Sequence, residues 1–193
     1  GFHEGLMELA VSKAFSVPPA LVRRAGMLTG DIGEVVFIAK MQGKEGVLKL
    51  QFKVFRPIKP MMAQMAEDVN EALKEAGGEM AFEYKLDGVR IQIHKSNSDV
   101  RVFSRRLTDV TESLPEVVQL VKDEVKAQQV ILDGEVIAVG EEKSPLLFQH
   151  VMRRFRRVHG IEEMTKQIPV ELQLFDIIYI NGHSLINLPY TER

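Results

Sequence analysis

The pattern of apolar and polar positions divides the chain into a helical first part and a later part rich in strands. Over residues 1–42, apolar residues such as Leu6 and Leu9 recur at helical spacing, which predicts helices. Asp31 stands where it can cap the segment that follows it. From residue 80 onward, short runs of β-branched and aromatic residues predict strands instead. These runs cover residues 81–85, 89–95, 100–104, 130–139 and 170–180.

The stretch between these two parts predicts a connection followed by a helix. After a break at Gly43, residues 47–55 alternate between two sets of side chains, as in a strand or an extended linker. Pro60 marks a second boundary. Residues 61–76 then predict a helix, which Gly77 ends.

Two further helices are expected among the strands. Residues 115–128 predict the first, introduced by Ser113 and Glu116 at the spacing of a capping box. Residues 148–157 predict the second, with one apolar stripe that is expected to pack in a core rather than to bind a cofactor. Together the elements predict an α+β fold, in which an antiparallel sheet follows a short all-α piece.

Composition narrows the class of protein. The 193 residues, 45% of them hydrophobic, suffice for one core, or for one domain and part of another. The sequence contains no cysteine, which excludes disulfides, thiolate chemistry and cysteine-ligated zinc. No apolar run approaches the length of a membrane span, and the first residues lack the layout of a signal peptide. We therefore expect a cytoplasmic protein without membrane contact.

Net charge and the spacing of the histidines limit the kinds of binding site that the chain can contain. With a formal net charge of −2, any contact with nucleic acid must be local. The one dense basic cluster, at residues 153–157, is explained either as a solvated helix face or as a phosphate-binding site, and a solvated face is the commoner case. The histidines show no ligand spacing, so no metal site is predicted within this chain. A phosphate-binding loop ending in Gly-Lys-Ser/Thr does not occur either.

The residues with the clearest chemical content lie at 83–90, EYKLDGVR. The Asp-Gly pair predicts a tight turn between two strands, and alternation would place Glu83 and Lys85 on one face. An Asp-Gly turn and a lone lysine are both common on protein surfaces. A lysine amine becomes a useful nucleophile when nearby cations favour its unprotonated form, and Arg90 and Arg105 can supply that charge and hold a phosphate.

Within this stretch, YKLDGVR resembles the nucleotidyl-lysine motif, Lys-x-Asp-Gly-x-Arg, of the covalent nucleotidyltransferases. That superfamily comprises DNA ligases, RNA ligases and mRNA-capping guanylyltransferases. Four further segments are similar, in the same order, to ATP-dependent DNA ligases of the archaeal and eukaryotic kind. They are PMMA at 60–63, FSRR with DVT at 103–111, LDGE at 132–135 and FDIIYING at 175–182. Five motifs in family order favour this family over coincidence.

The resemblance implies a fold and a set of site residues. The fold is an antiparallel-sheet nucleotidyltransferase (adenylation) domain of the ATP-grasp-like ligase type. Lys85 is the expected catalytic residue, which takes AMP from ATP. The matching positions imply a contact with adenine for Glu83, with the ribose or phosphate for Arg90, with the nucleotide and the nick for Arg105, with the ribose for Glu135, and stacking on adenine for Phe175.

The resemblance also implies a division of the chain. Residues 1–45 are expected to be the last helices of a DNA-binding domain, 46–57 a linker or strand, and 58–193 an adenylation domain truncated at its C-terminal end. The family's metal-binding glutamate, its later lysine-rich motif and its OB-type domain have no counterpart here. The main ligands of Mg²⁺ are therefore expected outside this chain, and the chain alone is expected to be inactive.

The expected partner is nicked duplex DNA, with a sliding clamp possible through a region preceding the chain. The parent protein is expected to be a monomer associated with the nucleoid, and an archaeal origin is suspected. An RNA ligase or capping enzyme is one alternative, against which the helical leader and FSRR argue. The other is a binding module without enzymatic activity that uses the cluster at 153–157, for which salt-dependent DNA binding without adenylation would be the signature.

Overall fold

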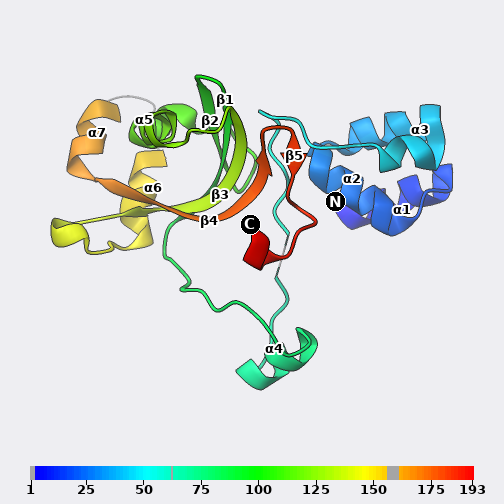
Figure 1. Ribbon diagram of the computed structural model, residues 1–193, viewed down its shortest axis with the longest axis horizontal. Coiled ribbons are helices and arrows are strands. Elements are labelled where there is room, and N and C mark those ends of the chain that lie inside the picture. The colour runs from blue at the N-terminus through cyan, green and yellow to red at the C-terminus, as the bar shows by residue number, and fades with distance from the viewer. Residues whose placement is uncertain (1–2, 62, 156–160) are drawn as a thin grey trace.

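The computed structural model describes residues 3–61, 63–155 and 161–193, and it consists of a helical unit beside a five-stranded antiparallel sheet (Figure 1). The helical unit contains α1 (Glu4–Phe15), α2 (Pro19–Thr29) and α3 (Ile32–Leu48). The sheet contains β1 (Val89–Ser96), β2 (Asp99–Ser104), β3 (Gln129–Ala138), β4 (Val170–Ile180) and β5 (His183–Ser184), in the order β2-β1-β3-β4-β5. The predicted α+β architecture is confirmed.

The helical unit follows the predicted pattern up to its last helix. Asp31 caps α3 as expected, because its Oδ1 accepts a hydrogen bond from the Gly33 N–H at 2.8 Å. At Gly43, where φ is 61°, α3 kinks instead of ending, and it continues to Leu48. The strand or linker predicted for residues 47–55 is therefore wrong for residues 47 and 48, which belong to α3. Val47 is 1% exposed within the core of the helical unit, so packing outweighs the local alternation.

The segment between the linker and the sheet differs most from the prediction. Helix α4 covers only Val69–Glu75, and Asp68 caps it by accepting from the Glu71 N–H at 2.9 Å. Residues 81–85 pair with none of the described strands, so the hairpin expected at the Asp-Gly pair is wrong. The reason is that β1 already has β2 on one edge and β3 on the other, which leaves it no free edge.

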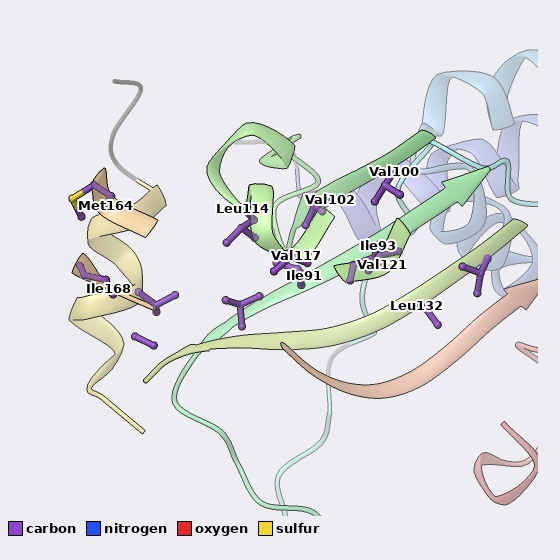
Figure 2. Packing of buried hydrophobic residues seen from close by; sticks show 14 residues of the cluster. Ile91, Ile93, Val100, Val102, Leu114, Val117, Val121, Leu132, Met164 and Ile168 are labelled. Atoms are coloured by element: carbon purple, nitrogen blue, oxygen red, sulfur yellow. The ribbon is translucent and has the colours of Figure 1, made fainter. Parts of the chain in front are cut away.

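Three helices cover one face of the sheet, and they are α5 (Pro115–Glu124), α6 (Phe148–Phe155) and α7 (Ile161–Gln167). Figure 2 shows Ile91 beside Val117 and Ile93 beside Val121, and Leu132 belongs to the same buried cluster. Val151, in the predicted apolar stripe of α6, is fully buried in the same cluster. The stripe therefore serves the core, as predicted. Three short 3-10 turns, Thr111–Ser113, Glu141–Lys143 and Tyr190–Glu192 (η1, η2 and η3), complete the described elements.

Helix α5 begins without the predicted capping box. Its N-cap is Leu114, and Glu116 pairs instead with Arg154 of α6, at 2.5 Å to Nη1 and 2.9 Å to Nη2. The Arg154 side chain is 1% exposed, and it also donates to the carbonyl oxygens of Ser113 and Ile168. The basic cluster is therefore not simply a solvated face, and its residues 156–157 lie outside the described part of the chain.

Helix α5 also ends earlier than predicted, at Glu124 rather than near residue 128. The carbonyl oxygens of Val125 and Ala127 accept hydrogen bonds from Nζ of Lys95, at 2.8 and 2.7 Å. Lys95 lies in β1 and is only 7% exposed. Its ammonium group ties this irregular segment to the sheet, which replaces the last turn of the predicted helix.

The linker between the helical unit and α4 crosses the opposite face of the sheet. Phe52 and Ile58 of the linker pack with Leu28 of α2, Ile131 of β3 and Ile178 of β4 in a second buried cluster. This cluster joins the helical unit to the sheet through apolar contact. The sheet is therefore covered on both faces, by helices on one and partly by the linker on the other.

Side chains of β1 fasten the same linker. Nδ1 of His94 accepts from the Phe55 N–H at 2.9 Å, and Oε1 of Gln92 accepts from the Ile58 N–H at 2.8 Å. Burial lowers the pKa of His94 to about 3, so its ring is neutral at ordinary pH. A neutral ring is what the Phe55 N–H requires, because the acceptor nitrogen must carry no proton.

We expect Glu116→Ala to lower the free energy of unfolding by about 3 kcal/mol, because Arg154 then keeps its charge in a buried position with no carboxylate to balance it. Urea unfolding followed by circular dichroism measures the change. Glu124→Ala, at the exposed end of α5, is the matched control and is expected to change the free energy of unfolding by less than about 0.5 kcal/mol. Equal effects of the two substitutions would contradict the buried pair.

We expect acid to destabilise the protein through His94. The unfolded chain takes up a proton near the ordinary pKa of 6.5, whereas the folded ring takes it up only near 3. Stability is therefore lost as the pH falls below 6.5, by about 2 kcal/mol between pH 7 and pH 5. His94→Asn, which cannot titrate, removes that part of the pH dependence of the urea midpoint. The same pH dependence in both proteins would show that the His94 ring takes up its proton at the same pH in the folded and unfolded chains.

Candidate active site

The polar face of β1 begins with Arg90, two residues before Gln92 on the same side of the strand. Its guanidinium is bound by Asp133 of β3, with Nε 3.0 Å from Oδ1 and Nη2 2.5 Å from Oδ2. The Asp133 side chain is buried, while that of Arg90 is about one-third exposed. The hydrogen bond to Asp133 raises the pKa of Arg90, although burial opposes the shift. The guanidinium therefore stays charged and is held in one orientation.

Glu135 lies directly opposite Arg90 in the pairing of β1 with β3. Its Oε1 accepts a hydrogen bond from the Gly88 N–H at 3.1 Å. Gly88 sits so close to β3 that a Cβ there would lie 2.4 Å from the Val136 carbonyl oxygen. This glycine lets the segment before β1 approach the Glu135 carboxylate, of which the second oxygen is left for another donor.

Phe175 enters the same face from β4. The Arg90 guanidinium carbon lies 5.6 Å from the centre of the Phe175 ring. The Tyr190 hydroxyl of η3 lies 2.6 Å from the Phe175 carbonyl oxygen and also donates to the Glu83 carboxylate. The hydrogen bond to Glu83 raises the pKa of Tyr190 to about 12. Tyr190 therefore connects Glu83 to the strand that carries Phe175.

Arg105, which follows the end of β2, lines a shallow hollow beside Arg90. Asp133 of β3 and the linker residues Ile58 and Pro60 line the same hollow. Two arginines thus face one space, next to a buried carboxylate that already pairs with one of them. This is an arrangement that can hold an anionic group such as a phosphate.

Lys85 lies in the segment before β1 and is exposed. On one side of it, Glu83 is held by Tyr190. On the other, Oδ2 of Asp87 accepts from the Phe148 N–H at 3.1 Å. Within the described part of the chain, no hydrogen bond or ion pair joins Lys85 to the other site residues. Because this segment is not a strand, the predicted shared face of Glu83 and Lys85 is not formed by strand alternation.

The structure thus brings Arg90, Glu135 and Phe175 onto one face and places Arg105 at its edge. Sequence reasoning gave no role to Tyr190, which follows a proline and carries no motif. It also left Asp133 without a partner, although the spacing contained a signal. Asp133 is two residues before Glu135 and so lies on the same face of the strand. In an antiparallel pair, such a residue is a diagonal neighbour of the side chain opposite Glu135, which here is Arg90.

No group of three or more histidine, aspartate or glutamate side chains suited to a metal ion occurs among residues 3–61, 63–155 and 161–193. In the same residues, no helix is long and apolar enough to cross a membrane.

One face of the antiparallel sheet thus carries two arginines, two carboxylates and an aromatic ring, which are groups able to contact a phosphate, a sugar and a base. The chain belongs to the family described as "ATP dependent DNA ligase domain", whose profile matches residues 60–193. The family predicted from the five motifs is thereby confirmed. The match begins at residue 60, so it excludes the whole helical unit and all of the linker before that residue.

Relatives with curated names match over the whole chain. It is 48% identical over 193 residues to a DNA ligase of Thermococcus fumicolans and 49% identical to one of Thermococcus onnurineus (strain NA1). The chain spans 34% of each of these proteins, about a third of their length. Among solved structures, mycobacterial DNA ligase D complexed with ATP and MES aligns with a TM-score of 0.46 and 28% identity, over 57% of this chain and 33% of that one.

We expect Gly88→Ala to lower the free energy of unfolding by about 1–3 kcal/mol, because the new Cβ collides with backbone of β3 and moves the Glu135 side chain. Gly5→Ala is the matched control, since nothing lies within 4 Å of a Cβ there. In helix α1 it is expected to raise stability by roughly 0.5 kcal/mol. The urea midpoints of the two variants measure both changes. A Gly88→Ala protein as stable as the wild type would contradict the close approach of Gly88 to β3.

Proposed function

We propose that the protein containing this chain is an ATP-dependent DNA ligase that seals nicks in duplex DNA through AMP bound covalently to Lys85. The observation that carries this proposal is the fixed pair of Arg90 and Asp133 between Glu135 and Phe175, in a chain of the DNA ligase domain family. These groups offer charge, a hydrogen-bond acceptor and a ring face to one ligand. A nucleotide presents the matching phosphate, sugar and base.

In the first step, Nζ of unprotonated Lys85 attacks the α-phosphorus of ATP. A phosphorus–nitrogen bond forms, the bond to the bridging oxygen breaks, pyrophosphate leaves and the amine loses a proton. Phosphoryl transfer of this kind depends on positioning and charge neutralisation more than on acid or base catalysis. Arg90, held by Asp133, keeps a positive charge fixed at the site throughout.

In the second and third steps, DNA takes the place of pyrophosphate. An oxygen of the 5′-phosphate at a nick attacks the AMP phosphorus, which frees Lys85 and leaves AMP on the DNA end. The neighbouring 3′-hydroxyl then attacks the 5′-phosphorus, so that the phosphodiester forms and AMP leaves. Arg105, at the outer edge of the hollow, is the residue we assign to the phosphate of the nick.

The remaining site residues hold the nucleoside. Phe175 offers a ring face to adenine, and a purine there either displaces Arg90 or stacks on the opposite face of the ring. The free oxygen of Glu135 accepts from a ribose hydroxyl. Glu83 accepts from the adenine amino group, which requires it to share or exchange its bond with Tyr190. These roles make the site selective for a purine nucleotide.

Mg²⁺ supplies further neutralisation of the phosphates when bound. Asp133 and Glu135 are each engaged by protein donors, so the main metal ligands are assigned to the part of the protein outside this chain. On the same ground, the chain by itself is assigned no complete catalytic activity. The full-length protein is proposed to act as a monomer on nicked DNA, with contact to a sliding clamp outside this chain.

The alternative of a binding module without enzymatic activity is weakened by Arg154. This residue of the basic cluster is buried against Glu116, and so is not available to a phosphate. The other alternative, an RNA ligase, is separated by substrate. We expect the full-length protein to seal a nick in duplex DNA at least about tenfold faster than a nick in duplex RNA, and the reverse preference would contradict the assignment.

The decisive measurement is the intact mass of the full-length protein after incubation with ATP and Mg²⁺. The wild type is expected to gain one AMP, and Lys85→Ala and Lys85→Arg to gain none, because neither offers a primary amine at that position. Lys74→Ala, on the exposed side of α4, is the control and should gain AMP like the wild type. Pyrophosphate treatment beforehand removes any AMP already bound. A folded wild type that gains no AMP would refute the proposal.

A further inference from the structure

The linker residues 49–60 form no helix or strand, so their buried backbone groups must find partners elsewhere. Two of these groups are the N–H groups of Phe55 and Ile58. Both donate to side chains of β1, the first to Nδ1 of His94 at 2.9 Å and the second to Oε1 of Gln92 at 2.8 Å. The two acceptors are alternate residues of one strand and lie on the same face as Arg90.

The two side chains also bind each other. Nε2 of His94 lies 2.8 Å from Oε1 of Gln92, and Nε2 of Gln92 donates to the Ile58 carbonyl oxygen at 3.4 Å. Because Nδ1 accepts from the Phe55 N–H, the neutral ring carries its proton on Nε2 and donates it to Gln92. His94 is fully buried and Gln92 is 9% exposed, so every polar side-chain atom of the pair is used inside the protein. Groups of this kind are costly to bury unless they are satisfied.

The backbone at Phe55 is strained, and the pair holds it there. Its φ of 68° lies in the left-handed region, which a bulky residue seldom adopts. Besides the bond from its N–H to His94, its ring packs against Arg101, with the guanidinium carbon 5.1 Å from the ring centre. Such a conformation persists only where the surroundings determine it, and it is common at positions that serve a function.

The fastened part of the linker reaches both the site and the helical unit. Ile58 and Pro60 line the hollow that contains Arg105, and neither Glu135 nor Phe175 is among the residues that line it. Between them, the Lys59 N–H donates to the Met27 carbonyl oxygen of α2 at 3.2 Å. Three consecutive residues thus form a wall of the hollow and a contact to the helical unit.

We propose that Gln92 and His94 are positioning residues, which seat the linker as a wall of the hollow and thereby align the helical unit for the joining of DNA ends. This inference rests on the proposed ligase function. Formation of lysyl-AMP uses the proposed nucleoside contacts of Glu135 and Phe175, which do not line the hollow, and so depends less on the linker. Sealing of a nick uses Arg105, and the resemblance implies that the helical unit belongs to a DNA-binding domain that contacts the same DNA. Sealing therefore depends on the linker directly.

The test compares two single-turnover rates in the full-length protein. One is lysyl-AMP formation from ATP, and the other is sealing of a nick whose 5′-phosphate already carries AMP. Gln92→Leu is expected to slow sealing about tenfold more than it slows lysyl-AMP formation. The control is Gln119→Leu, which removes hydrogen bonds to Asp123 within α5, on the opposite face of the sheet, and is expected to leave the ratio of the two rates unchanged.

Two variants of His94 test whether a conservative substitution preserves the sealing rate. Asn can place its side-chain oxygen near the position of Nδ1, so His94→Asn is expected to keep most of the sealing rate that His94→Leu loses. Amide hydrogen exchange at Phe55 and Ile58 gives a readout independent of activity. Exchange is expected to be about tenfold faster at Ile58 in Gln92→Leu and at Phe55 in His94→Leu, and unchanged at both residues in Gln119→Leu.

Each failure has its own signature. Unchanged amide exchange at Ile58 in Gln92→Leu would show that Gln92 does not hold the linker, and so overturns the proposal at its first step. Faster exchange with an unchanged ratio of rates overturns the positioning role, because the bonds then serve stability alone. A wild type that forms no lysyl-AMP overturns the proposed function and the role derived from it, whereas the exchange measurement still decides whether the two side chains hold the linker.

Discussion

The pairing of β1 with β3 places almost everything else in this protein. With β2 and β3 on its two edges, β1 has no free edge, and its side chains alternate between two covered faces. On one face, Ile91 and Ile93 fill the core beneath the three helices. On the other, Arg90, Gln92 and His94 meet Asp133 and the linker. A shift of one residue in this register would exchange the two sets.

The polar face works because its charges and hydrogen-bonding groups are matched in pairs. Asp133 fixes Arg90, Gln92 fixes the Ile58 backbone, and His94 stays neutral because burial lowers its pKa. Gln92 also binds His94, and it lines the same hollow as Arg90 and Asp133. The proposed nucleotide site and the seat of the linker therefore lie on one polar face of β1.

The sequence predicted the elements best where local chemistry and packing agree. The cap at Asp31, the strands of the sheet and the apolar stripe of α6 follow from spacing alone, and the motifs led to the family. It failed where a distant partner competes with a local one. Glu116 has the spacing of a capping residue, but the buried Arg154 binds it. Residues 81–85 have the composition of a strand, but β2 and β3 occupy both edges of the strand they would pair with.

By itself, the sequence determined the strands β1 to β4, the family and the candidate residues of the site, because these depend on side-chain chemistry at fixed spacing. Only the tertiary structure decided which of those residues meet. The approach of Asp133 to Arg90, of Tyr190 to Glu83 and of the linker to Gln92 joins residues between 34 and 107 positions apart. Contacts over such separations depend on how the sheet closes against the linker and the last turn, and no local pattern encodes that closure.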